Sequence, residues 1–112
     1  MVTPPLKLDA GEEVVIAVQA LRRKGIFGNR FGELVITNRR VAFMKAIMNA
    51  GVISALASKV AKPMLEAPRA EVTGATRVAL KKQVAVEVTL AGKPERFVID
   101  EAWVDRVIAA VT

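Results

Sequence analysis

The chain has 112 residues, of which 53% are hydrophobic and 25% charged, so it can bury the core of one ordinary domain. It contains no cysteine, histidine or tyrosine, which excludes a disulfide framework, a thiol nucleophile and a histidine base or zinc ligand. The net charge is +6, and the excess of Lys and Arg lies entirely in residues 1–62. This asymmetry indicates a face for an anionic partner, and plain solubility is the alternative explanation.

The first residues predict an extended lead-in and not a signal peptide. Pro4 and Pro5 are followed by early acids where a signal peptide needs an apolar core. No apolar run reaches the roughly 18 residues that span a bilayer. We therefore expect a soluble cytoplasmic protein, with the inner face of the membrane as the place of any peripheral contact.

The first half of the chain predicts three strands. Val14 to Arg23 is rich in β-branched residues, and "KGIFGNRFG" after it is a glycine-rich loop. "ELVIT" and "RVAFMK" are two short apolar runs joined by Asn38-Arg39, a two-residue connection typical of a β-hairpin.

The segment from Ala46 to Lys62 breaks the β pattern and predicts an amphipathic helix at about 49–62. Asn49 is a suitable N-cap and Pro63 ends the helix. One side of the predicted helix is apolar and carries Met48, Val52, Ile53, Leu56 and Val60.

The second half predicts further short strands and a last helix. Breaks are expected at Pro68 and Gly74, and strict alternation over residues 84–90 indicates a half-buried strand, followed by a strand over 95–99. Asp100 is a suitable N-cap for a helix whose apolar stripe is formed by Trp103, Val104, Val107, Ile108 and Val111. We expect Trp103 to plug the open end of a small, strongly bent sheet, with Phe43 and Phe97 in the same core.

Four stretches of the sequence resemble the bacterial pleckstrin-homology-like domains of the GRAM type. They are "LDAGEEVV", "GELVITNRRVAFMK", "EAPRAEVTGATRV" and "VAVEVTLAGKPERFVI", and with the final helix they cover nearly the whole chain from residue 8. The most specific part is the hairpin pattern formed by Gly32, Leu34, Thr37, Asn38 and Arg40.

The resemblance implies a single domain over residues 1–112, mainly β. The expected fold is a partly open barrel of about seven antiparallel strands in two near-orthogonal sheets, capped by the C-terminal helix. It also implies a non-catalytic module, without a cofactor, that binds lipids, peptides or other proteins. The helix predicted at about 49–62 departs from this pattern, which has a shorter connection there.

The first candidate surface is the loop "RRKGIFGNR". Classical pleckstrin-homology domains bind phosphoinositide head groups through basic residues of the loop between their first two strands, and this loop is similar in position and charge. The expected anionic-ligand surface consists of Arg22, Arg23, Lys24, Phe27 and Arg30, extended by Arg39 if the hairpin turn lies nearby. The alternative is that Ile26 and Phe27 fold back onto the core and that the cations are only solvated. Arg40 matches the family's hairpin position, and we expect it to stabilise the turn by binding carbonyls or a carboxylate such as Glu33.

The second candidate surface is the apolar side of the predicted helix 49–62. It can dock on the barrel, pair with a second copy of the protein or lie on a membrane. Two hypotheses follow: a peripheral module that binds anionic lipid or an acidic protein through residues 22–30, and a structural domain that self-associates through this helix.

The sequence disfavours two other functions, nucleic-acid binding and catalysis. Single-strand binding needs several exposed aromatic residues, and only Phe27 and Phe31 are candidates. No pair of carboxylates, no calcium loop and no phosphate-binding glycine motif stands out, so we expect no metal site.

Overall fold

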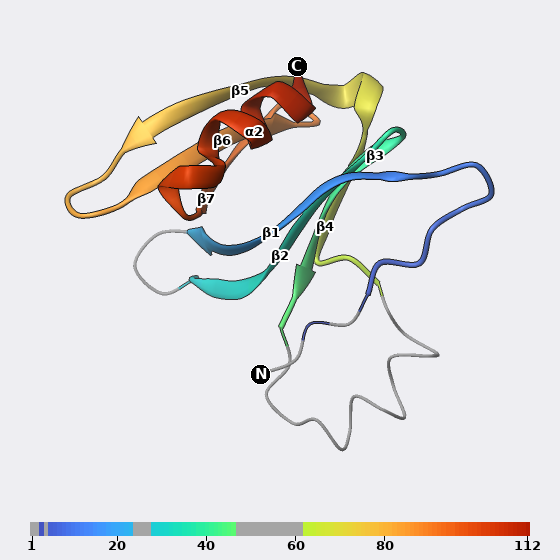
Figure 1. Cartoon of the computed structure of the whole chain (residues 1–112), viewed down its shortest axis with the longest axis horizontal. Coiled ribbons are helices and arrows are strands. Elements are labelled where there is room, and N and C mark those ends of the chain that lie inside the picture. Colours follow the sequence, from blue (N-terminus) through green and yellow to red (C-terminus); the bar gives the residue numbers. More distant parts are fainter. Residues whose placement is uncertain (1–2, 4, 24–27, 47–61) are drawn as a thin grey trace.

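A computed structural model describes residues 3, 5–23, 28–46 and 62–112 (Figure 1). Within these residues the chain forms one antiparallel sheet of seven strands, followed by a C-terminal helix. The elements are β1 (Val14–Arg23), β2 (Arg30–Thr37), β3 (Arg40–Lys45), β4 (Leu65–Pro68), a 3-10 turn η1 (Arg69–Glu71), β5 (Val72–Ala79), β6 (Val84–Leu90), β7 (Lys93–Val98) and α2 (Glu101–Val111). The prediction of a mainly β chain with about seven antiparallel strands and a terminal helix is confirmed.

The strands are hydrogen-bonded in the order β4-β3-β2-β1-β7-β6-β5, so they belong to one continuous sheet and not to two separate sheets. The sheet is not closed, because β4 and β5 each have one strand neighbour in this order. β1 and β7 pair through only three residue pairs, from Leu21↔Val98 to Arg23↔Arg96, and this is the shortest junction in the sheet. The helix predicted at about 49–62 lies outside the described residues.

The β2–β3 hairpin has the predicted two-residue connection at Asn38-Arg39. β2 begins at Arg30, within the segment predicted as a loop, because Arg30 and Phe31 pair with Arg22 and Leu21 of β1. The break predicted at Gly74 is wrong. β5 continues through this residue, and the irregularity is confined to a register shift between Val72 and Gly74.

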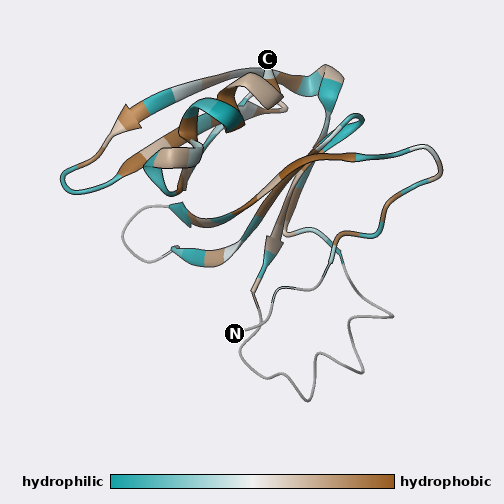
Figure 2. Cartoon of the chain, in the orientation of Figure 1, coloured by the Kyte–Doolittle hydropathy of each residue, from teal (hydrophilic) through white to brown (hydrophobic). Residues whose placement is uncertain are grey.

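The core lies on one face of the sheet, under α2. β1, β2, β5 and β6 all contact the helix, which buries Val104, Val107 and Val111. Phe43 and Phe97 are fully buried and their ring centroids lie 5.5 Å apart, as expected for core residues. Figure 2 shows the hydrophobic colour along the middle of β1 and the hydrophilic colour at the β5–β6 turn.

Trp103 does not plug the sheet. This residue remains 40% exposed, and the guanidinium carbon of Arg106 lies 4.9 Å from the Trp103 ring centroid. The buried stripe of α2 consists of Val104, Val107 and Val111 and is narrower than the stripe expected from the sequence. Trp103 lies beside this stripe and not within it. The predicted N-cap is confirmed, since the Asp100 side chain accepts a hydrogen bond of 2.9 Å from the Ala102 amide.

Candidate functional site

Two regions that are distant in the sequence, residues 9–13 and 37–40, meet in one polar cluster around Glu12. The Glu12 side chain is fully buried, although it lies in a turn. Its carboxylate accepts hydrogen bonds from Arg40 Nε at 2.8 Å and Nη2 at 2.9 Å, from the Thr37 hydroxyl at 2.7 Å and from the Asp9 amide at 2.9 Å. Glu12 is therefore the acceptor that joins the lead-in turn to the β2–β3 hairpin.

The hairpin turn is held from several sides. The Thr37 hydroxyl accepts hydrogen bonds from the Arg39 and Arg40 amides, each at 3.0 Å. Asn38 accepts from the Glu13 amide and donates to the Gly11 carbonyl. Thr37, Asn38 and Arg40 thus have a structural role: their hydrogen bonds join the β2–β3 turn to the turn at residues 9–13.

Arg40 has the structural role that the sequence predicts, but with other partners. Its guanidinium binds Glu12, Glu66 and the carbonyl oxygen of Lys7, and not Glu33. Glu33 lies on β2 opposite Gln19 and Met44, away from the turn. The carboxylate partners come from other segments, 28 and 26 residues away along the chain, which a sequence pattern does not reveal.

The Glu12–Arg40 contact dominates the electrostatics of the cluster. Hydrogen bonds from Arg40, and then from Thr37 and the Asp9 amide, outweigh the opposing effect of burial and lower the pKa of Glu12 to about 2. The same contact raises the pKa of Arg40 above its ordinary value. Both groups stay charged at neutral pH, so this cluster stabilises the fold and has no proton to exchange.

Arg22 does not belong to an exposed basic surface, which corrects the sequence prediction. Only 5% of its side chain is accessible, and Nε and Nη2 donate to the Glu95 carboxylate at 3.1 and 3.2 Å. Strand alternation explains the burial, since Arg22 lies on the same face of β1 as the core residues Val18 and Ala20.

The end of the β1–β2 hairpin does expose two of the predicted cations. Arg23 and Arg30 are both exposed, and no carboxylate of the described residues lies within salt-bridge distance of either. Phe31 beside them is 58% exposed, which is unusual for a large apolar side chain in a strand. Lys24 and Phe27 lie outside the described residues. The exposure of Phe31 was detectable in principle, because Phe31 and the core residue Leu34 lie an odd number of positions apart on one strand.

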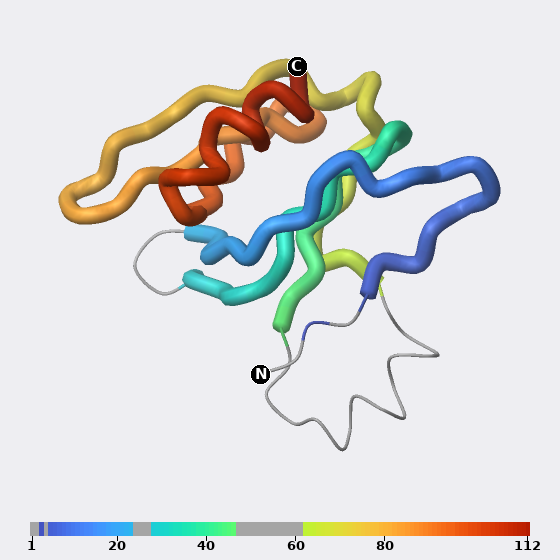
Figure 3. The backbone as a smooth tube through the Cα atoms, viewed as in Figure 1, coloured from blue at the N-terminus to red at the C-terminus, as the bar shows by residue number. Residues whose placement is uncertain are grey.

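Arg39 lies at the other end of the same hairpin strand. β2 separates the two sites by seven residue steps, or about 23 Å of extended chain. Figure 3 traces this path from the start of β2 to the β2–β3 turn. Arg39 packs beside Gly11. The condition for including Arg39 in the predicted surface, a turn close to Arg23 and Arg30, is therefore not met.

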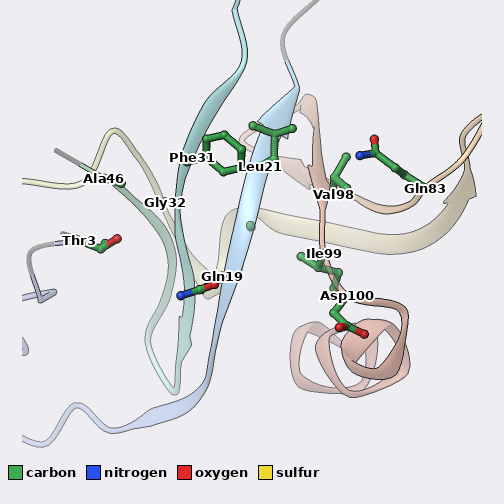
Figure 4. Close-up of a pocket in the computed structure, with 11 residues that line it drawn as sticks. Thr3, Gln19, Leu21, Phe31, Gly32, Ala46, Gln83, Val98, Ile99 and Asp100 are labelled. Atoms are coloured by element: carbon green, nitrogen blue, oxygen red, sulfur yellow. The ribbon is translucent and has the colours of Figure 1, made fainter. Parts of the chain in front are cut away.

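A groove crosses β1 close to the exposed hairpin end (Figure 4). Its volume is about 710 Å³. Leu21, Phe31, Val98 and Ile99 contribute apolar lining, and the remaining lining residues are Thr3, Gln19, Ala20, Gly32, Ala46, Gln83 and Asp100. No pattern in the sequence indicates this groove, because β1, β2, β7 and the residues that precede α2 meet there only in the folded chain.

The second candidate surface, formed by Met48, Val52, Ile53, Leu56 and Val60, lies outside the described residues. Among the residues that are described, no helix is long and apolar enough to cross a membrane. The same residues contain no group of three or more acidic side chains that could hold a metal ion.

No family model matches the chain, and no curated protein matches it. A solved structure, the crystal structure of the C-terminal domain of an unknown protein from Leishmania infantum, is similar in fold. The two share 17% sequence identity and a TM-score of 0.63, over 91% of this chain and 83% of that one. At this identity the likeness shows the fold alone, a β-rich sheet with a terminal helix.

Proposed function

We propose that the protein is a non-catalytic, pleckstrin-homology-like module of the GRAM type that binds anionic membrane lipid through the end of its β1–β2 hairpin. The observation that carries the proposal is the combination of exposed, unpaired Arg23 and Arg30 with the exposed ring of Phe31, within the described residues. Two further observations support the assignment to this type. The chain forms a single bent sheet with a C-terminal helix, and the Glu12–Arg40 contact joins the two family-like motifs.

The chemistry of the hairpin end suits a charged membrane surface. Each cation near an anionic leaflet contributes about 1 kcal/mol, and a Phe side chain that leaves water contributes about 1.5–3 kcal/mol. Two cations and one ring therefore give a weak, reversible and salt-sensitive attachment, which is the behaviour of a peripheral module.

Vesicle sedimentation tests the proposal with a matched pair of variants. Arg23→Ala and Arg39→Ala each remove one positive charge, so the net charge of the two proteins is the same. We expect wild-type protein to sediment with vesicles of phosphatidylcholine and phosphatidylglycerol at low salt, but not with phosphatidylcholine alone. Arg23→Ala weakens this binding about fivefold, whereas Arg39→Ala leaves it unchanged.

Three outcomes would count against the proposal. If wild-type protein stays in the supernatant with anionic vesicles at low salt, the proposed lipid binding is wrong. Equal losses in Arg23→Ala and Arg39→Ala assign the binding to net charge and not to the hairpin end. Binding to a polyglutamate column that matches the vesicle result in every variant would point instead to an acidic protein partner.

A further inference from the structure

We propose that the groove across β1 holds the hydrocarbon chain of a single-chain amphiphile, with the anionic head group of that ligand at Arg23. This inference rests on the proposed membrane function and deepens it, because it names a ligand that is bound one molecule at a time. The apolar residues Leu21, Phe31 and Val98 of the groove lie outside the core cluster, whereas Ala20 and Ile99 belong to both the groove lining and the core cluster. No residue of the Glu12–Arg40 cluster lines the groove.

The apolar part of the groove has a simple origin in strand pairing. Leu21 is paired with Phe31 of β2 on one side and with Val98 of β7 on the other. Side chains of directly paired residues point to the same face of a sheet, so these three form a continuous apolar strip across β1. All three line the groove and none belongs to the core cluster.

The groove exists because β1 and β7 separate beyond this strip. Their pairing ends at Leu21 and Val98, and the chain then turns through Ile99 and Asp100 into α2. Gln19 and Ala20 of β1 also line the groove. The volume of about 710 Å³ falls within the range of about 300–1,000 Å³ that small-molecule sites occupy.

Charge gives the groove a direction. Arg23 lies two residues beyond Leu21 on the same face of β1, and its partner on β7 is Arg96, which is also exposed and pairs with Glu87 at 3.2 Å. The opposite end carries Asp100, which also caps α2. An anionic head is therefore attracted to the Arg23 end and repelled from the Asp100 end, and the chain between them covers the apolar strip.

This arrangement favours an amphiphile over a bare anion or a neutral lipid. A small anion would leave Leu21, Phe31 and Val98 in water, and a neutral chain would leave Arg23 without a partner of opposite charge. A fatty-acid anion supplies both parts, and so does a lipid with one chain and a phosphate head.

Titration of laurate, below its critical micelle concentration, into isotopically labelled protein tests the proposal. We expect saturable chemical-shift changes at Gln19, Leu21, Phe31 and Val98. Affinity should rise from octanoate to laurate, by up to about fourfold for each methylene that leaves water. Acetate, which lacks the chain, and dodecyl maltoside, which lacks the charge, should bind at least about tenfold more weakly than laurate.

A matched pair of variants separates the groove from the membrane contact. Gln19→Trp places a large ring in the groove, whereas Ala17→Trp places the same ring two residues earlier on the same exposed face and outside the groove. Gln19→Trp should weaken laurate binding at least about tenfold and leave vesicle sedimentation intact. Ala17→Trp should change neither.

The inference is overturned if laurate causes no shift changes in the groove, if acetate reproduces them, or if Gln19→Trp and Ala17→Trp bind laurate equally well. If vesicles still sediment the wild-type protein in that case, the proposed membrane function stands without the groove. If laurate binds as expected and vesicles do not, the groove stands and the membrane contact fails.

Discussion

The carboxylate of Glu12 lies in a surface turn, yet it is the most connected acidic group in the described structure. It accepts four hydrogen bonds, two of them from Arg40, and its side chain is inaccessible to water. Loss of its charge leaves the Arg40 guanidinium short of acceptors in a mostly buried position. This single contact therefore contributes more to the fold than its place in the sequence indicates.

Glu12→Gln should lower the free energy of unfolding by about 1.5–3 kcal/mol, because hydrogen bonds between charged groups are lost at a buried site. Glu66→Gln is the matched control, since Glu66 binds the same arginine but its side chain is 44% exposed. Glu66→Gln should lower the free energy of unfolding by less than about 1 kcal/mol. Urea unfolding monitored by the fluorescence of Trp103 measures both, and equal costs would contradict the special role of Glu12.

The depressed pKa of Glu12 predicts an acid-sensitive fold. The pKa is about 2 in the folded protein and 4.5 in the ordinary case, so the folded state holds this proton less tightly than the unfolded chain does. The stabilisation is complete above pH 4.5 and is lost as the pH falls from there towards 2. Unfolding free energies measured across this range should fall less steeply in Glu12→Gln than in the wild type, and parallel curves would contradict the prediction.

At the scale of elements, the β2–β3 hairpin depends on a close approach of two backbones. A Cβ atom on Gly32 would lie 2.1 Å from the Met44 carbonyl oxygen and 2.8 Å from Phe43 Cζ. Only glycine leaves room for this contact, so the glycine of the hairpin motif is required by packing and not by turn geometry.

Gly32→Ala should destabilise the protein by about 1–3 kcal/mol, because the strands must move apart or the core must shift. Gly74→Ala serves as the control in another strand, since no atom lies within 4 Å of a Cβ added there. Thermal unfolding followed by circular dichroism distinguishes them. A Gly32→Ala protein as stable as Gly74→Ala would show that β2 and β3 are not packed this tightly.

At the scale of the whole molecule, charge and exposed apolar surface should act over different ranges. If the proposed function holds, the net charge of +6 should draw the protein towards an anionic surface, and salt should screen that attraction over about 10 Å at 0.1 M. The exposed Phe31 should act only on contact, because burial of apolar surface does not depend on screened charge.

Vesicle binding should therefore have two components. Raising salt from 50 to 500 mM should remove most of the binding of the wild type, and Phe31→Ser should remove most of what remains. Val15→Ser is a suitable control, because Val15 is 56% exposed but lies towards the other end of β1. Equal residual binding of the two variants at high salt would show that Phe31 does not enter the membrane.

The sequence by itself determined the strand succession, the hairpin at Asn38-Arg39, the Asp100 cap and the burial of Phe43 and Phe97. These features follow from local propensities and from the period of apolar residues, which act over a few positions. The presence of exposed cations near residues 23–30 could be predicted for the same reason.

Only the tertiary structure decided which charged side chains are exposed to solvent and which strands form the groove. Arg22 and Arg23 are neighbours in sequence, but alternation turns one towards Glu95 and the core and the other towards solvent. Arg39 proved distant from that hairpin end, Trp103 proved exposed, and Glu12 proved buried. The groove at Leu21, Phe31 and Val98 depends on three strands from separate parts of the chain. The opposite faces of Arg22 and Arg23 follow the period of two along β1. The Arg22–Glu95 contact, the burial of Glu12 and the groove depend on long-range contacts, which leave no periodic mark in the sequence.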